Sequence, residues 1–257
     1  MITLHNNFLR ALFVLLALTV VVSFSQSQKK IHSSVSSVDT LFTPLSDSIG
    51  PLAEGAVAWG DYDNDGALDL FVNGRKPTSS AINYSLIYHN TNGHFVQIND
   101  SLVGIHGNNK CAGWVDYNND GKLDLYLNGS QGPSNTNAIA KIYRNAGSGM
   151  FTDITTTILG LAGTSAWGDY NNDNNIDLLA TGSPDNGGSI LSKIYRNDGN
   201  GNFTDIQALL TGVWGASVAW GDYDNDGRQD LIITGLTNNG TSGTTKVYHN
   251  NGDGTFT

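Results

Sequence analysis

The stretch AVAWGDYDNDGALDLFVNG, residues 56–74, places four aspartates within nine positions and then continues into apolar residues. Carboxylates this close repel one another, since two unit charges 4 Å apart cost roughly 4 kcal/mol at an effective dielectric constant of about 20. The same pattern returns at residues 111–129, 164–182 and 217–235. The first aspartates, Asp61, Asp116, Asp169 and Asp222, are 55, 53 and 53 residues apart, so the chain is built on a repeat of this length.

A second half of each repeat follows, at residues 86–98, 141–154, 193–206 and 246–257. Both halves alternate apolar or β-branched segments with turns rich in Gly, Asn and Asp, which predicts four short antiparallel strands per repeat. Such a long, regular repeat of four strands is typical of a β-propeller with one blade per repeat. The predicted fold is therefore an all-β propeller of four-stranded blades. A β-sandwich is the alternative, although sandwiches seldom keep so strict a period.

Four repeat cores fill most of the chain, near residues 56–98, 111–154, 164–206 and 217–257. The segment LFTPL at 41–45 resembles the outer strand of a repeat, so we expect the repeat domain to span residues 41–257. The last motif stops as another outer strand begins. The first strand could thus complete the last blade of a four-bladed ring, or the chain could belong to a longer propeller. We favour an incomplete, truncated propeller, because four blades are the lower limit of this fold.

The first 25 residues have the pattern of a secretory signal peptide. Arg10 precedes a continuous apolar run at 11–22, and the small residues Ser23 and Ser25 precede a possible cleavage before Gln26. The run is shorter than the ~20 residues that a membrane helix needs. We therefore expect a signal peptide at 1–25, a linker at 26–40, and a mature protein that is secreted or lies at the cell surface. An uncleaved membrane anchor is the alternative.

The composition indicates a turn-rich β protein and argues against nucleic acid as a partner. Of the 23 acidic residues, 22 are Asp and only Glu54 is Glu, and 31 residues are Gly. Asp and Gly favour turns and ligand loops, whereas Glu favours helices. The net charge is −10, and the 13 Lys and Arg residues form no cluster that could neutralise phosphates. The single Cys111 excludes an internal disulfide framework.

The aspartate loops have the ligand pattern of a calcium site. We number each loop from its first aspartate, so that positions 1–9 are residues 61–69, 116–124, 169–177 and 222–230. Side-chain oxygens fall at positions 1, 3, 5 and 9, and position 7 varies so widely that only its backbone carbonyl suits a ligand. The predicted ligands are Asp61, Asp63, Asp65, Ala67 and Asp69; Asp116, Asn118, Asp120, Lys122 and Asp124; Asp169, Asn171, Asp173, Asn175 and Asp177; and Asp222, Asp224, Asp226, Arg228 and Asp230.

An all-oxygen set with flexible spacing favours Ca²⁺ over Mg²⁺, with about one ion per repeat and up to four in all. Gly at position 6 permits the sharp turn around the ion, and Asn174 replaces it in the third loop with a residue that tolerates a left-handed backbone. These loops are not EF-hands, because position 12 is an apolar residue in every repeat and not the bidentate Glu of that motif. Ca²⁺ would relieve the crowding of like charges.

The unit AWGDYDNDGxxDLxxxG followed by YxNxGxGxF resembles the VCBS/FG-GAP repeat family, whose best-known members include the N-terminal propellers of integrin α subunits. The resemblance covers residues 41–257. It implies a β-propeller with Ca²⁺ in its DxDxDGxxD loops, and an integrin α-like, extracellular role such as cell adhesion. Trp-Gly replaces the Phe-Gly of the family, and Trp114-Val115 stands there in the second repeat. Complete members form seven-bladed rings, whereas this chain carries four repeats.

No catalytic motif accompanies the repeats, so we expect no enzyme activity. HExxH and G-x-S-x-G are absent, and Cys111 occupies a strand position that holds Ala, Thr or Ser in the other repeats. The predicted function is a secreted calcium-binding module for binding or adhesion, with an extracellular protein or a glycan as its partner. A glycan-binding lectin, or an accessory domain of a polysaccharide-degrading enzyme, is the alternative.

Two further sets of residues recur once per repeat. The aromatic residues Trp59, Trp114, Trp167 and Trp220, with Tyr88, Tyr143, Tyr195 and Tyr248, lie at strand positions, and we expect them to pack between blades. The basic residues His89, Arg144, Arg196 and His249 share one position before the hairpin turn. We interpret the basic set as hairpin surface and not as catalytic bases.

Overall fold

The computed structural model describes residues 49–77, 82–99, 101–107, 111–132, 137–185, 189–237 and 242–257. These residues all belong to one compact unit, Ser48–Thr257. The predicted signal peptide, the linker and the strand expected at 41–45 lie outside the described residues. The strands and contacts that the structure defines are therefore those of the repeat unit.

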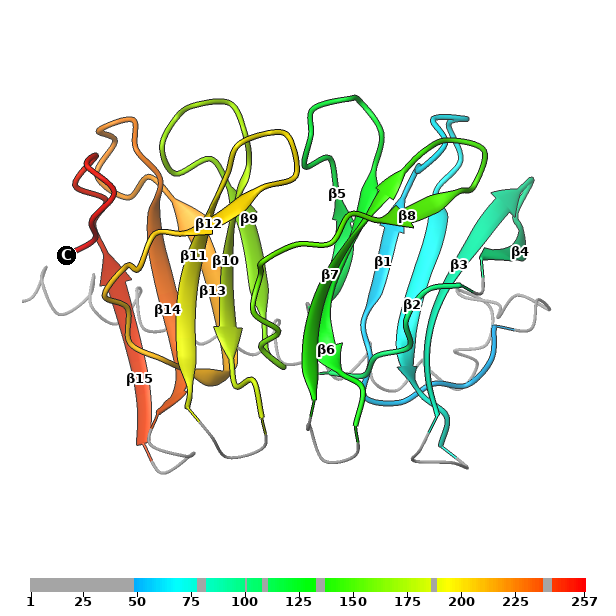
Figure 1. Cartoon of the computed structure of the whole chain (residues 1–257), viewed down its shortest axis with the longest axis horizontal. Helices are drawn as coiled ribbons and strands as arrows, with labels where there is room; N and C mark the ends of the chain where they lie inside the picture. Colours follow the sequence, from blue (N-terminus) through cyan, green and yellow to red (C-terminus); the bar gives the residue numbers. More distant parts are fainter. Residues whose placement is uncertain are drawn as a thin grey trace, which may run out of the picture. The chain divides into compact units, whose positions relative to one another are not determined.

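Four antiparallel sheets make up this unit (Figure 1). The first contains β1 (Val57–Gly60), β2 (Asp69–Arg75), β3 (Asn83–Thr91) and β4 (His94–Asn99). The second contains β5 (Ala112–Val115), β6 (Asp124–Ser130), β7 (Ala138–Asn145) and β8 (Phe151–Asp153). The third contains β9 (Ser165–Gly168), β10 (Asp177–Gly182), β11 (Leu191–Asn197) and β12 (Phe203–Asp205). The fourth contains β13 (Trp214–Gly221), β14 (Asp230–Thr237) and β15 (Ser242–Tyr248).

Each sheet is a simple meander in which neighbouring strands pair in chain order, so the predicted four-stranded blade is confirmed for three repeats. The fourth sheet differs, because its outer strand is reduced to the single bridge Asn250↔Phe256. Two backbone hydrogen bonds between His249 and Thr257, 2.8 and 3.0 Å long, hold this bridge in place. Its register matches the pairing of Asn145 with Phe151 in the second sheet. The fourth sheet therefore follows the same design as the other three.

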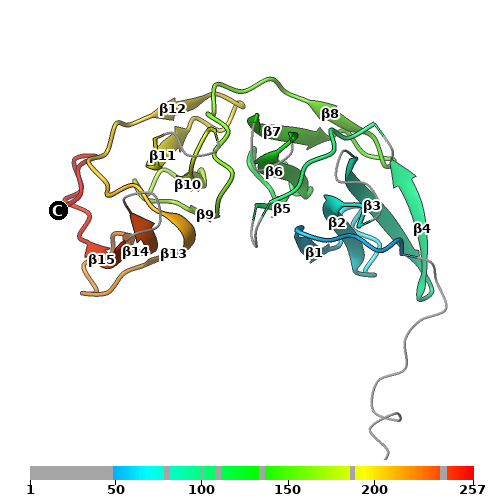
Figure 2. The same cartoon turned by 90° about the horizontal axis from the view of Figure 1, so that it is seen from below.

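Apolar side chains between consecutive sheets form the core. There are three such buried clusters. They lie between the first and second sheets, between the second and third sheets, and between the third and fourth sheets. In Figure 2 the sheets follow one another in chain order, with β1, β5, β9 and β13 on the inner side of the row and β4, β8 and β12 on the outer side. The described residues do not close into a ring, so a complete propeller remains a prediction.

In the second, third and fourth repeats the recurrent aromatic residues lie at the joints between consecutive sheets, as expected, whereas Trp59 is exposed and Tyr88 packs within the first sheet. Tyr62 in the first aspartate loop stacks on Trp114 of the second sheet with ring centroids 6.0 Å apart, and Tyr170 stacks on Trp220 at 6.4 Å. Aromatic pairs contribute beyond the area that they bury. The hydroxyl of Tyr143 also accepts a hydrogen bond of 3.1 Å from the backbone N–H of Val103, in the connection between the first two sheets. The aromatic set therefore stabilises the joints between blades.

The described residues contain strands, bridges and turns but no helix. Among them there is consequently no helix with the length and hydropathy needed to cross a membrane. Cys111 is buried as a free thiol between the first two sheets, where the side-chain amide of Asn73 contacts its sulfur at 3.6 Å. Burial raises the pKa of this thiol, which agrees with the prediction of a small packed residue.

Candidate metal centres in the aspartate loops

Each aspartate loop connects the first and second strands of a sheet and coils tightly because two of its residues have a left-handed backbone. At position 4 the residue is always Asn, and its φ in the first loop is 60° at Asn64. At position 6 the φ values are 90° at Gly66, 81° at Gly121 and 85° at Gly227. Asn174 adopts 69° at the same place, so the third loop keeps this backbone without glycine, as predicted.

The carboxylate at position 1 organises the coil. Asp61 Oδ1 accepts a hydrogen bond from the backbone N–H of Asp65 at 3.0 Å, and its Oδ2 accepts one from Gly66 at 2.9 Å. The other three loops repeat both contacts, at 2.8–3.1 Å, through Asp116, Asp169 and Asp222. Two donors from the backbone of positions 5 and 6 therefore fix this carboxylate at the centre of the loop.

The carboxylates at positions 3 and 5 turn toward the same centre. In the first loop, oxygens of Asp61, Asp63 and Asp65 all lie within 4.8 Å of one another. Position 5 also accepts the N–H of position 7, for example Ala67 to Asp65 Oδ1 at 2.7 Å. Three carboxylates at this spacing repel one another strongly unless a cation lies between them.

Position 9 does more than the sequence indicated, because it ties the loop to the hairpin of the same sheet. Asp177 is fully buried, and its Oδ1 accepts the N–H of Asn197 at 2.8 Å while its Oδ2 accepts the N–H of Tyr170 at 3.2 Å. Burial raises the pKa of Asp177 to about 7 and that of Asp124 to about 6. Burial also raises the pKa of Asp69. These groups are therefore both candidate ligands and structural anchors.

The second loop contains a weakly satisfied acceptor. Asp124 Oδ1 accepts the N–H of Asn145 at 2.7 Å, but the buried Oδ2 of Asp124 has only a weak contact with the backbone N–H of Tyr117. A buried carboxylate oxygen is destabilising when its hydrogen bonds are weak or missing. A hard cation coordinated by the loop would satisfy it, and the all-oxygen donor set suits Ca²⁺.

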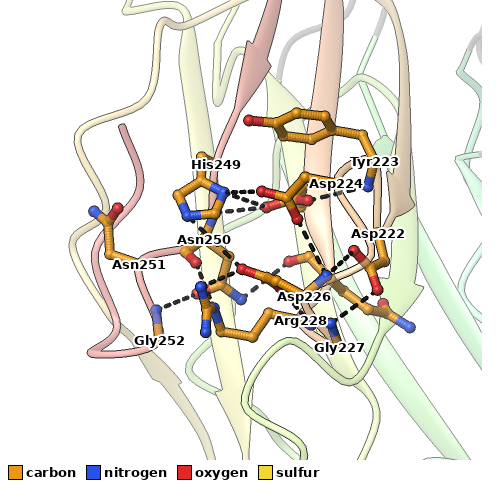
Figure 3. Close-up of polar contacts among 12 residues, drawn as sticks. Asp222, Tyr223, Asp224, Asp226, Gly227, Arg228, His249, Asn250, Asn251 and Gly252 are labelled. Carbon is orange, nitrogen blue, oxygen red and sulfur yellow. Dashed lines mark hydrogen bonds and ion pairs between the residues drawn. The ribbon is translucent and has the colours of Figure 1, made fainter.

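Three of the four recurrent basic residues, His89, Arg144 and His249, contact carboxylates of the aspartate loops while their side chains stay partly exposed on the hairpins. Figure 3 shows His249 facing the fourth loop, where its Nδ1 lies 3.2 Å from Asp224 Oδ2 and 3.3 Å from Asp230 Oδ1. His89 Nδ1 lies 3.2 Å from Asp69 Oδ1 in the first loop. In the second loop, an Arg144 nitrogen lies 3.6 Å from Asp120 Oδ2. A recurrent basic position opposite an acidic loop is the signal that the sequence offered for this contact.

Hydrogen bonds also connect one loop to the next. The position-4 side-chain amide of Asn64 donates to the carbonyl of Gly121, at position 6 of the second loop, with a length of 3.0 Å. Asn119 and Asn172 make the equivalent bond to the third and fourth loops, both at 2.9 Å. Turn chemistry alone explains Asn at this position, so no contact between blades could be expected from the residue type.

The raised pKa values of Asp124 and Asp177 lead to a prediction for the metal-free protein. Between about pH 4 and pH 7 these two carboxyl groups still hold protons in the folded protein, whereas in the unfolded chain they have already released them. The free energy of unfolding should therefore fall as pH rises through this window. Urea denaturation of metal-free protein at several pH values measures this. Asp177→Asn should flatten the profile, and a wild-type profile that rises instead would contradict it.

Comparison with protein-family models identifies the repeat. The model of the FG-GAP-like repeat matches residues 61–127, 116–180 and 169–233. Each match begins at the first aspartate of one loop and ends in the second strand of the next sheet, so it includes two consecutive aspartate loops and the joint between them. Comparison with curated protein sequences gave no match. Because the matched residues cover well over half of the chain, this protein belongs to the FG-GAP-like repeat family.

Proposed function

We propose that the chain is a secreted, calcium-stabilised module that binds an extracellular protein or a glycan in a role such as adhesion. The observation that supports it best is the convergence of three acidic side chains in the first loop, together with the same hydrogen-bonded arrangement of positions 1, 3 and 5 in all four loops. FG-GAP-like repeats suggest a propeller-like binding module. We propose the calcium sites, the export and the adhesive role in addition to this.

In each loop the side chains at positions 1, 3, 5 and 9 would hold the ion, together with the backbone carbonyl of position 7. In the first loop these are Asp61, Asp63, Asp65, Ala67 and Asp69. Carboxylate oxygens that already accept an N–H keep further lone pairs for a cation. Ca²⁺ bound there supplies positive charge and holds the two strands that flank the loop. With so many protein ligands, it would serve a structural and not a catalytic purpose.

The basic residues near the loops do not argue against this assignment. Arg144 and Arg228 each form an ion pair with a position-5 carboxylate, but their side chains are partly exposed. Surface pairs of this kind are worth only about 0–1 kcal/mol, so a divalent ion can compete with them. His89 and His249 would likewise give up their carboxylate contacts or remain beside an occupied loop.

Calorimetric titration with Ca²⁺ and thermal unfolding test the calcium proposal. We expect saturable binding of up to four ions and a melting temperature that falls in excess EDTA and returns with Ca²⁺. Asp169→Asn should remove one site, whereas Asp185→Asn, an exposed residue outside the loops, makes the same charge change without affecting binding. Identical melting curves in EDTA and in Ca²⁺ would overturn the proposal.

The binding role needs a separate test. Labelled chain is applied to arrays of glycans and of extracellular proteins in Ca²⁺, with an EDTA arm as the control. A hit that disappears in EDTA supports a calcium-dependent binding module and identifies the class of ligand. The absence of any hit on both arrays would contradict the binding role while leaving the calcium sites intact.

A further inference from the structure

Each of the first three sheets has one face that packs against the next sheet. Three equivalent positions on that face are buried in all three cases. These positions are the Tyr at loop position 2, the third residue of the second strand, and an apolar residue in the third strand. They are Tyr62, Phe71 and Ile87; Tyr117, Tyr126 and Ile142; and Tyr170, Leu179 and Ile194, and each of these residues is at most 6% exposed. This repeated burial defines what a completed joint looks like.

The fourth sheet leaves the same three positions open. Tyr223 is 60% exposed, Ile232 41% and Val247 55%. Exposed apolar residues scattered singly are ordinary, but these three are aligned on one face and correspond by register to the buried set. The fourth sheet therefore presents one half of a joint.

The three completed joints show what the missing half must contain. Its apolar part is a Trp from the strand before the aspartate loop, as in the stack of Tyr62 on Trp114. Its polar part is a position-6 carbonyl, which accepts the position-4 amide, as Gly227 accepts from Asn172 at 2.9 Å. A hairpin Asn adds a bond in the opposite direction, as Asn250 Nδ2 donates to the carbonyl of Tyr170 at 2.8 Å.

The first sheet has the equivalent groups, and no neighbouring sheet of the described residues contacts them. Trp59 is 57% exposed, and Leu68 is 56% exposed, although its equivalents Leu123 and Ile176 pack in joints. The hairpin residue Asn90 donates its side-chain amide to Leu68 O at 2.9 Å, and the described part of the chain offers it no Tyr carbonyl of a preceding loop. These three residues belong to the loop end of the sheet.

The part of that face on β2 and β3 is already covered. Leu70, Val72 and Tyr88 are buried in a cluster with Leu52 packed against them. The side chains that remain open to a partner are therefore Trp59 and Leu68 at the loop end, and Val57 at the start of β1, which is 71% exposed.

We propose that the fourth sheet of one chain docks on the first sheet of a second copy of the same chain. Tyr223 of the first copy stacks on Trp59 of the second copy. The side-chain amide of Asn225 in the first copy donates to the Gly66 carbonyl of the second copy. In the opposite direction, the side-chain amide of Asn90 in the second copy donates to the Tyr223 carbonyl of the first copy. The contact is heterologous, because different surfaces meet. Two copies that each contribute the four described sheets can make it twice and close into one ring, within the range of about four to eight blades that propellers adopt.

Sedimentation equilibrium of the full chain tests the proposal. Wild type should have about twice the chain mass of 27.4 kDa at micromolar concentrations. Tyr223→Ala should raise the dimer dissociation constant at least tenfold, and Ile232→Lys should do the same. Val96→Ala and Val96→Lys are the matched controls, because Val96 is 57% exposed but lies on the outer strand, away from either half-joint.

Mixing two variants distinguishes this contact from other ways of associating. Ile232→Lys disables the fourth-sheet face and Trp59→Ala disables the first-sheet face, so each variant alone should be monomeric. An equimolar mixture retains one intact pair of faces and should form a heterodimer. A monomeric wild type, including one whose fourth sheet closes on its own first sheet, would overturn the proposal. So would a dimer that is as sensitive to Val96→Lys as to Ile232→Lys.

Discussion

Asn197→Leu should lower the free energy of unfolding by about 3–5 kcal/mol, because it leaves one buried and two partly buried backbone groups without partners, and a fully buried group costs about 1–3 kcal/mol. Asn197 is fully buried. Its Nδ2 donates to the carbonyls of Tyr117 at 2.7 Å and Ile176 at 3.0 Å, and its Oδ1 accepts the N–H of Gly199 at 2.9 Å. One side chain thereby joins the second sheet, the third aspartate loop and the hairpin turn.

Urea denaturation measures the effect of Asn197→Leu, and Asn90→Leu is its control. Asn90 occupies the same position in the first repeat, but its bonds to Leu68 O and from Gly93 N are exposed to solvent. Water can replace both, so we expect the control to lose no more than about 1 kcal/mol. Equal losses in the two variants would show that the bond to Tyr117 across the joint contributes little.

Gly163→Ala should destabilise the protein by about 3 kcal/mol or more, beyond the usual range for overpacking, because backbone atoms cannot yield as a side chain can. A Cβ at Gly163 would lie 2.1 Å from the carbonyl oxygen of Thr181 and 2.8 Å from the Cα of Gly182. Here the connection from the second sheet crosses the end of β10 before it enters β9. Gly55 makes the same close approach to β2 in the first repeat, where a Cβ would lie 1.7 Å from the carbonyl oxygen of Asn73.

The matched control for this substitution is Gly113→Ala in β5. A Cβ at Gly113 meets nothing within 4 Å, so alanine should be neutral or slightly stabilising, because it restricts the unfolded chain. Thermal unfolding of both variants, with circular dichroism to confirm the β fold, gives the comparison. A Gly163→Ala variant as stable as Gly113→Ala would mean that the backbone at this crossing relaxes freely.

The sequence was sufficient to predict the blades because their signals are local. The repeat period located each sheet, and Gly or Asn at the turns located the strand ends, including Asn174 with its left-handed φ of 69°. The small residue position of Cys111 and the packing role of Trp114 were also predicted from their places in the repeat. Each of these inferences depends on a pattern within one unit of about 50 positions and on its recurrence in the other three units.

The contacts that the sequence did not reveal join residues far apart in the chain. Asn64 donates to a carbonyl 57 positions later, and Asn145 donates to Tyr62, 83 positions earlier. Such bonds depend on how one sheet is rotated against the next, which no local pattern encodes. The anchoring role of Asp177 was missed for a related reason, since its partner Asn197 lies on a separate hairpin. Recurrence of these Asn residues in every repeat was the available signal.

The hydrogen bonds between blades have a constant direction. The loop amide of Asn119 donates forward to the next repeat, and the hairpin amide of Asn197 donates backward to the previous one. Every repeat thus has a front, where its loop Asn donates to the following repeat, and a back, where its hairpin Asn donates to the preceding repeat. An additional copy could be inserted between two neighbouring repeats without a new substitution. Duplication of a coding segment of one whole period would lengthen the array with intact joints. Duplication of a partial period would leave a front without a back, so growth by whole units is built into the chemistry of the repeat.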